Sequence, residues 1–318
     1  MQNVYAPEGA RIHSPSNTES LSSLAELEKA MISGKILEAP AILCDNKMCL
    51  HVDLGGIEGI IEKSEVVFSP SGEPLKDIAV ITRVGKPVCF KILSIEQQRG
   101  KPLARLSRKA AQQDCYREFL SHLRCGDVIP ARVTHMEPFG AFVDIGCGLV
   151  SLLSIDCISV SRISHPRDRL NVGNAIWVVV KTVDRENGRI FVSMRELLGT
   201  WEQNAAAFEI GQTVAGVVRS VEPYGVFVEL APNLAGLAEL RPDLNLPSPE
   251  GLIGQYAAVY IKNIIPERMK IKLVLVDAYH GDIRKMPLQY YVDGSQCTHI
   301  DYWRYSPDCA SKLVETVF

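Results

Sequence analysis

Apolar and polar residues alternate along the middle of the chain in short runs that end at glycine, asparagine or aspartate. Between residues 125 and 195 this pattern predicts five β-strands, at residues 128–135, 139–145, 148–153, 175–183 and 190–194. A polar connection, residues 159–170, separates the third strand from the fourth. Short strands divided by Gly and Asx turns favour a small closed barrel.

The same order of strands recurs further along the chain. We expect strands at residues 213–221, 224–230, 236–240, 257–264 and 270–276. Gly126 recurs as Gly211, 85 positions on. At the same spacing, Glu137, Pro138, Gly140, Phe142 and Val143 recur as Glu222, Pro223, Gly225, Phe227 and Val228. A repeat of this length is too long for a solenoid unit and suits a small domain.

A fainter copy precedes both units. Residues 52–55 resemble residues 143–146, residues 88–95 resemble residues 176–183, and residues 106–107 resemble residues 192–193. The pattern therefore predicts a mainly β protein with three tandem five-stranded barrels.

Helical spacing occurs outside these units. Ser23 and Glu26 have capping-box spacing, and apolar residues follow at helical intervals, so we expect a helix over residues 23–32. Two connectors carry apolar residues about every four positions, which favours short α-helices packed against the barrels. These residues are Ala111, Cys115, Phe119 and Leu123, and then Leu197, Trp201, Ala205 and Phe208.

The patterns divide the chain into seven segments. We expect a flexible leader over 1–19, a helix and degenerate barrel over 20–107, a helical linker over 108–124, a barrel over 125–195, a second helical linker over 196–210, a barrel over 211–278 and an aromatic-rich extension over 279–318.

Composition adds limits to this picture. The formal net charge of −3 argues against a general polyanion-coating protein but allows a basic face on one barrel. The sequence shows neither an apolar run of membrane-helix length nor a secretory signal, so we expect no membrane partner. The nine cysteines follow no regular disulfide framework, which favours a reducing cytoplasm.

Candidate chemistry is sparse. The sequence contains no phosphate-binding loop, paired-histidine motif or nucleophile elbow, so we expect no enzyme activity and no cofactor. Cys297, His299 and Cys309 are possible zinc ligands, with His280 as a candidate fourth. Their spacing matches no zinc motif, and we therefore expect no metal site.

The second and third units share a signature around their second strand. In the second unit it covers residues 138–145, 148–150, 183–184, 189–190 and 192–193, and in the third it covers residues 224–230 and 235–237. This signature resembles the S-one (S1) RNA-binding domain, a five-stranded barrel of the oligonucleotide-binding (OB) type. Through residues 199–202 and 232–237, the whole chain also resembles the short Firmicutes-type homologues of the small-subunit ribosomal protein that gave the domain its name.

The resemblance implies an RNA-binding face. In the family it is formed by two aromatics of the second strand, a histidine of the third, an aspartate after the fourth and an arginine opening the fifth. The corresponding residues are Phe139, Phe142, Ser151, Asp184 and Arg189 in the second unit, and Tyr224, Phe227, Glu239 and Lys270 in the third. Ser151 and Glu239 depart from the family histidine. In the first unit Met48 and His51 stand at the aromatic positions, so we expect it to bind protein rather than RNA.

Aromatic stacking and phosphate contacts are the means by which barrels hold single strands. Phe139 and Phe142 would lie on opposite faces of a regular strand, so we expect a bulge at Gly140 to bring them together; barrel core is the alternative for both. Asp184 is typical of a turn residue before residues 187–188. Possible phosphate contacts, with a solvated surface as the alternative, are Arg162, His165, Arg167, Arg169, Lys262 and Lys272.

The sequence thus predicts a non-enzymatic, monomeric cytoplasmic protein that binds single-stranded RNA. We expect it to hold mRNA during translation, as a small-subunit ribosomal protein or a ribosome-associated factor. The alternative is a protein-binding adaptor in an RNA-decay or transcription assembly.

Overall fold

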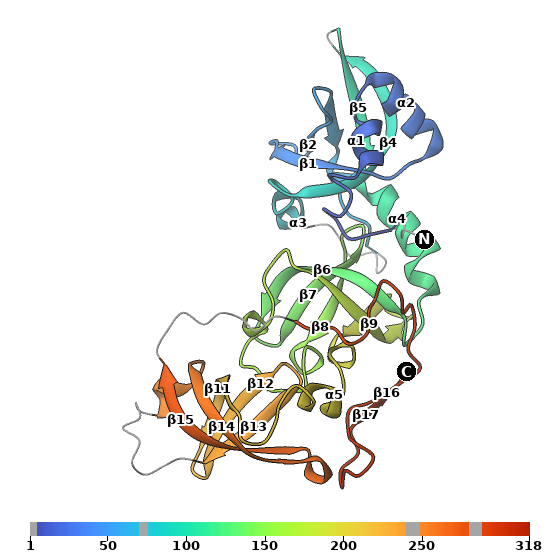
Figure 1. Cartoon of the computed structure of the whole chain (residues 1–318). Coiled ribbons are helices and arrows are strands. Elements are labelled where there is room, and N and C mark those ends of the chain that lie inside the picture. Colours follow the sequence, from blue (N-terminus) through green and yellow to red (C-terminus); the bar gives the residue numbers. More distant parts are fainter. Residues whose placement is uncertain (1–4, 70–75, 99, 240–248, 280–287) are drawn as a thin grey trace.

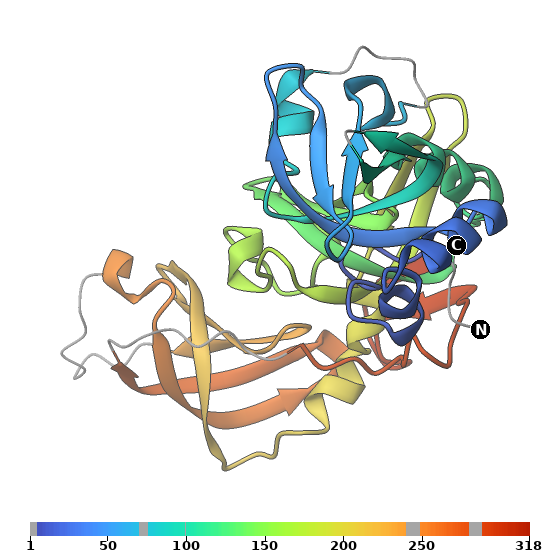
Figure 2. The ribbon, with the colours of Figure 1, turned by 90° about the horizontal axis from the view of Figure 1, so that it is seen from above.

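Three five-stranded closed barrels follow one another along the chain, as the sequence predicts (Figure 1). The structure is a computed structural model that describes residues 5–69, 76–98, 100–239, 249–279 and 288–318. Figure 2 shows the third barrel set to one side of the other two.

All three barrels have the same topology. The first comprises β1 (Leu37–Cys44), β2 (Leu50–Asp53), β3 (Glu58–Ile61), β4 (Pro87–Gln98) and β5 (Lys101–Ser107). The second comprises β6 (Val128–Glu137), β7 (Gly140–Gly146), β8 (Leu149–Ser154), β9 (Ala175–Asp184) and β10 (Arg189–Ser193). The third comprises β11 (Thr213–Glu222), β12 (Gly225–Ala231), β13 (Leu234–Glu239), β14 (Tyr256–Ile265) and β15 (Lys270–Tyr279). The third and fifth strands of each unit pair in parallel, which closes the sheet and removes its edges.

The predicted leading helix is confirmed as α2 (Leu24–Ser33). The Ser23 hydroxyl accepts a hydrogen bond from the Glu26 backbone N–H, and Gly34 ends the helix with a φ of 63°. The other α-helices are α1 (Pro15–Ser20), α3 (Asp77–Ile81), α4 (Arg108–Glu118), α5 (Trp201–Ala205) and α6 (Pro249–Leu252). Short 3₁₀ helices are η1 (Lys63–Glu65), η2 (Leu120–His122), η3 (Ile155–Cys157), η4 (Pro166–Asp168), η5 (Arg195–Leu198) and η6 (Pro266–Arg268). In the described ranges no helix is long and apolar enough to span a membrane.

The segment before α1 joins the first barrel to the second. We expected a flexible leader, but Glu8 is buried and receives hydrogen bonds from the buried Arg108 at 2.6 and 2.9 Å. The Glu8 backbone N–H also donates to the Asp144 carboxylate of β7 at 2.7 Å. Because a buried guanidinium needs a counter-charge, this segment is held in place between the barrels.

The connection at residues 159–170 joins the second barrel to the third. The Arg169 guanidinium lies 2.5 Å from the Glu229 carboxylate, and both side chains are fully buried. Arg219 contacts the same carboxylate at 2.7 Å. The backbone N–H of Ser161 also donates to the Pro232 carbonyl. This connection is therefore an interface between barrels rather than a free loop.

The C-terminal extension lies along both of these barrels (Figure 1). It contains the two-stranded sheet of β16 (Tyr302–Arg304) and β17 (Glu315–Val317). Trp303 and Tyr305 join the core of the third barrel. At the second barrel, the Val128 backbone N–H donates to the Thr298 carbonyl at 2.9 Å. The extension thus contacts the second and third barrels together.

Candidate nucleic-acid interface

Two aromatic rings meet at the tip of the β6–β7 hairpin. Phe139 lies in the two-residue turn between these strands, and its side chain is 55% exposed. The ring of the half-buried Phe142, in β7, contacts it edge to face, with centroids 6.1 Å apart. The pair therefore leaves ring surface open to solvent.

The expected bulge at Gly140 is absent. The β6–β7 register is regular from Gly140 to Phe142, and its irregularity lies on β6 between Val133 and His135, opposite Phe142 and Val143. Phe139 reaches the same surface as Phe142 because it precedes the strand, where alternation does not apply. Gly140 instead permits close packing, since a Cβ there would lie 2.6 Å from the Leu153 carbonyl oxygen.

The third barrel repeats the aromatic pair. Tyr224 lies in the β11–β12 turn and is 66% exposed, whereas Phe227 in β12 is half-buried. Their rings also meet edge to face, with centroids 6.3 Å apart. The two hairpins therefore offer equivalent ring pairs.

Strand pairing extends each ring pair into a row of side chains across the barrel, which we call the transverse row. In the second barrel the row is His135, Phe142, Leu152, Phe191 and Thr182. In the third barrel it is Ser220, Phe227, Leu237, Lys272 and Asn263. In the first barrel it is Leu43, His51, Ile60, Arg105 and Ser94. Directly paired residues share a face of the sheet, so each row forms one surface.

His135 is a member of this surface that sequence reasoning missed. Its ring stacks on Phe142 with centroids 6.1 Å apart, and its Nε2 lies 2.5 Å from a Glu137 carboxylate oxygen. The sequence does place His135 at the end of the first strand, and in the β6–β7 hairpin that position lies opposite Phe142, so hairpin pairing could have identified it. Phe191 was also missed. Only the pairing of β10 with β8 brings it beside Leu152.

The predicted cations open the last strand of each barrel. Arg189 is exposed and pairs in register with Asp184 across the β9–β10 turn. Hydrogen bonds from the Asn187 side chain and backbone to the Asp184 carboxylate lower its pKa and hold this turn closed. Lys270 is exposed at the start of β15. Both cations are thus available at the edge of the aromatic surface.

The two residues at the family histidine position lie in different places. Ser151 is only 3% exposed, and its hydroxyl donates to the Ile190 carbonyl at 2.6 Å, so it is not on the transverse row. Ser151 pairs with Val143, and Gly236 pairs with Val228 at the equivalent place, so Glu239 is not its counterpart. The Gly-Leu pair at residues 148–149 recurs at residues 236–237, but Leu237 takes the place of Leu152 on the strand. Glu239 is exposed and binds Lys262 at 3.0 Å.

The cluster of possible phosphate contacts is divided by the fold. Arg162 and Arg167 are exposed, but Arg169 is buried against Glu229 and cannot reach a phosphate from there. His165 accepts a hydrogen bond from the Arg167 backbone N–H and caps η4. Among the lysines, Lys262 and Lys272 are exposed on the third barrel.

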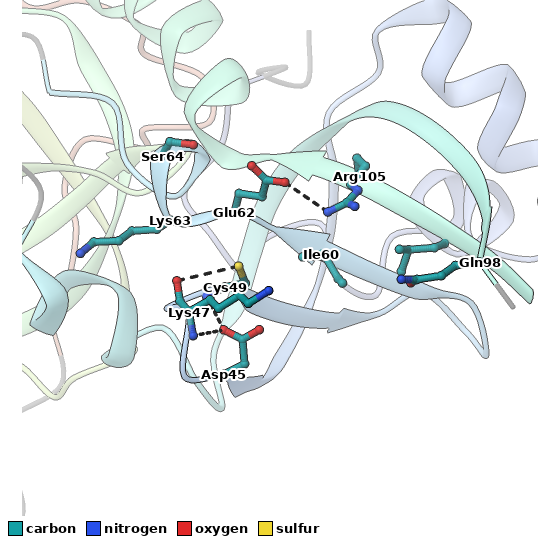
Figure 3. Close-up of a pocket in the computed structure, with 10 residues that line it drawn as sticks. Asp45, Lys47, Cys49, Ile60, Glu62, Lys63, Ser64, Gln98 and Arg105 are labelled. Atoms are coloured by element: carbon teal, nitrogen blue, oxygen red, sulfur yellow. Dashed lines mark hydrogen bonds and ion pairs between the residues drawn. The ribbon is translucent and has the colours of Figure 1, made fainter.

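The first barrel has no aromatic pair at this place. His51 occupies the position of Phe142, with ring nitrogens 2.8 Å from a Glu58 oxygen and 3.4 Å from an Asp45 oxygen. Met48 lies in the preceding turn. Beside them, Arg105 contacts Glu62 at 3.2 Å and lines a cavity of about 850 Å³ (Figure 3). This face is charged and lacks a stacking surface.

Two of the possible zinc ligands, His299 and Cys297, have other hydrogen-bond partners. The ring nitrogens of His299 lie 2.7 Å from Asp127 and 3.1 Å from Asp301, and the Cys297 thiol donates to the His299 carbonyl. His280 lies outside the described residues. Within the part of the chain that the structure describes, no three His, Cys, Asp or Glu side chains form a group fit for a metal ion.

Exposed ring pairs on OB-type barrels, beside cations, are typical of proteins that bind single-stranded nucleic acid. Residues 123–195 match the S1 RNA binding domain family, so the chain contains a domain of that family. Most of the chain is also similar to the small ribosomal subunit protein bS1.

Two relatives illustrate the extent of this similarity. The Small ribosomal subunit protein bS1 of Coxiella burnetii is 30% identical over 78% of this chain and 45% of its own length. The protein of the same name from Staphylococcus aureus is 28% identical over 83% of this chain and 67% of its own length. The chain spans less than half of several relatives, including 33% of the Rhizobium meliloti protein. The solution structure of GSP13 from Bacillus subtilis is 30% identical and covers 23% of this chain and 56% of that one, with a TM-score of 0.22.

Proposed function

We propose that the second and third barrels bind one single-stranded RNA during translation, as part of or beside the small ribosomal subunit. The observation that carries this proposal is the ring pair repeated at the same hairpin of both barrels, Phe139 with Phe142 and Tyr224 with Phe227. Every nucleobase has a π-face, so such pairs stack on bases with little sequence preference. Arg189 and Lys270 meet the phosphates at the edge of each pair.

The affinity of the chain arises from joining two modest sites. Once one barrel has bound, the second contact becomes effectively intramolecular, and avidity exceeds the affinity of either site. The mRNA of translation is the proposed ligand, and the protein acts as a cytoplasmic monomer without enzyme activity. The relatives named small ribosomal subunit protein support this role.

A protein-binding adaptor in an RNA-decay or transcription assembly is the second candidate. The first barrel favours it, because its transverse row carries His51 and Arg105 held by carboxylates instead of stacking rings. The adaptor function predicts that partner binding survives loss of the ring pairs in the other barrels.

Titration with fluorescent RNA tests the proposal. The full chain should bind an unstructured oligonucleotide more tightly than a duplex of the same length, because stacking requires exposed base faces. Binding should weaken as salt is raised, because phosphate contacts release counterions. Equal affinity for the duplex and the unstructured strand would reject single-strand binding at these faces.

A further inference from the structure

The transverse rows of the second and third barrels are alike in the middle and differ at three places. Phe142 and Leu152 of the second barrel correspond to Phe227 and Leu237 of the third. On the first strand His135 corresponds to Ser220, and on the last strand Phe191 corresponds to Lys272. On the fourth strand Thr182 corresponds to Asn263. The shared centre suits base stacking in both barrels. Thr182 and Asn263 are both small and uncharged, so the positions on the first and last strands decide whether the rest of each face contacts bases or phosphates.

The second barrel's row is lined by rings. His135 stacks on one side of Phe142, and Phe139 meets Phe142 edge to face. Phe191 extends the apolar surface beyond Leu152 to the last strand and is half-buried there. A surface of this kind contacts mainly bases. Arg189, two residues before Phe191 on β10, is the cation at its edge, whereas the third barrel has Lys270 and Lys272, so binding by the second barrel should depend less on salt.

The third barrel's row carries a cation where the second barrel has Phe191. Lys272 lies between Leu237 and Asn263, and its side chain is exposed. Lys270 lies two residues earlier on β15, so it projects from the same face of the strand. A lysine is a flexible point charge, which suits a phosphate rather than the edge of a particular base.

We infer that the two barrels hold one RNA strand differently: the second binds mainly its bases, and the third mainly its phosphates. Phe191 and Lys272 determine this difference. The inference rests on the proposed function, since it divides the work of RNA binding between the two faces.

The experiment compares two fluorescent oligonucleotides of equal length, an oligouridylate and its abasic counterpart, which keeps the phosphates and lacks the bases. Each is titrated at several salt concentrations into the full chain carrying Phe191→Leu or Lys272→Gln. Leucine keeps most of the apolar volume of Phe191 and removes its ring. Lys29→Gln, on the exposed surface of α2, is the matched control for loss of one charge. Thermal unfolding confirms that each variant is folded.

Phe191→Leu should weaken oligouridylate binding about fivefold or more without changing the salt slope or abasic binding. Lys272→Gln should weaken both oligonucleotides equally and reduce the slope of log affinity against log salt by about 0.7, the value for one phosphate on a single strand. Lys29→Gln should change neither quantity.

The inference is overturned if Lys272→Gln leaves the salt slope unchanged, or if Phe191→Leu affects both oligonucleotides alike. If the parent protein binds neither oligonucleotide, both the inference and the proposed function fail. If Phe142→Ala weakens binding but the two variants behave identically, RNA binding stands and only the division between the barrels is wrong.

Discussion

At the scale of single residues, a side chain's position relative to the end of its strand decides what it can bind. Phe139 and Tyr224 lie in hairpin turns, so they join the surface of a ring three residues later without any distortion of the strand. Being well exposed, they contribute little to the folded core. Their recurrence on two barrels is therefore best explained by a ligand.

Replacing both turn aromatics, Phe139→Ala with Tyr224→Ala, should weaken RNA binding by about 1–3 kcal/mol for each stack lost. Thermal stability should change little because both side chains are exposed. Fluorescence titration with single-stranded RNA measures the first effect, and circular dichroism measures the second. Met48→Ala with His51→Ala, at the positions of the ring pair on the first barrel, is the control and should bind RNA as the parent does. An unchanged affinity in the double aromatic variant would show that the ring pairs are not the RNA site.

At the scale of elements, the sequence predicts local structure well and long-range partners poorly. The strand at residues 175–183 is found as β9 (Ala175–Asp184), since β-branched runs between turns are a local signal. The second connector was expected to be one helix, but Gly199 has a φ of 85° and Thr200 begins α5 with a capping box. The role of Glu8 could not be predicted, because its partner Arg108 lies 100 positions away and a single acidic residue makes no pattern.

The candidate site divides in the same way. The ring pairs and cations could be identified from the sequence signature that recurs in the second and third units, because such a signature is local. The transverse row could not, because Phe191 and Leu152 become neighbours only through a parallel strand pairing. Arg169 was misassigned for a related reason: a polar connection does not reveal which of its cations faces another domain.

The C-terminal extension should be held less firmly at higher pH. Hydrogen bonds to Asp127 and Asp301 raise the pKa of His299 above its usual 6.5. The protonated ring therefore stabilises the folded state fully below that value, and the contribution is lost as pH rises through the raised pKa. The parent should lose more thermal stability than His299→Gln between mildly acidic and mildly alkaline pH. Parallel losses in both proteins would mean that this ion pair does not hold the extension.

At the scale of the whole molecule, the barrels are not independent units. Ile36 and Cys89 of the first barrel belong to the same core cluster as the interior of the second. Removing residues 20–107 would expose this core and remove Cys89 and Val66, whose backbone groups bond to Glu8 and Arg108 at the junction. Any function of the first barrel must therefore be tested by surface changes in the intact chain.

We expect the first barrel's transverse row to contact the small ribosomal subunit. Leu43→Asp with Lys47→Glu changes two exposed residues of this face without entering the core. The variant should lose co-sedimentation with small subunits, because two added negative charges weaken binding to a partner surface of the same sign. It should still bind free RNA oligonucleotides as the parent does. If it co-sediments at full strength in high salt, the first barrel is not the attachment surface.

The buried Arg169–Glu229 pair should fix the relative orientation of the two RNA-binding barrels. Arg169→Met leaves the buried Glu229 carboxylate with Arg219 as its remaining cation, and breaking such a pair costs on the order of 3–5 kcal/mol. Urea unfolding should show this loss, and Arg169→Lys, which keeps the charge, should show less of it.

Loss of this orientation should also reduce avidity. Arg169→Met should bind a strand long enough to reach both faces less tightly than the parent, because the second contact is no longer prearranged. Binding of an oligonucleotide too short to reach both faces should be unchanged, since neither ring pair is altered. Equal affinity of variant and parent for the long strand would indicate that the C-terminal extension, which contacts both barrels, is sufficient to align them.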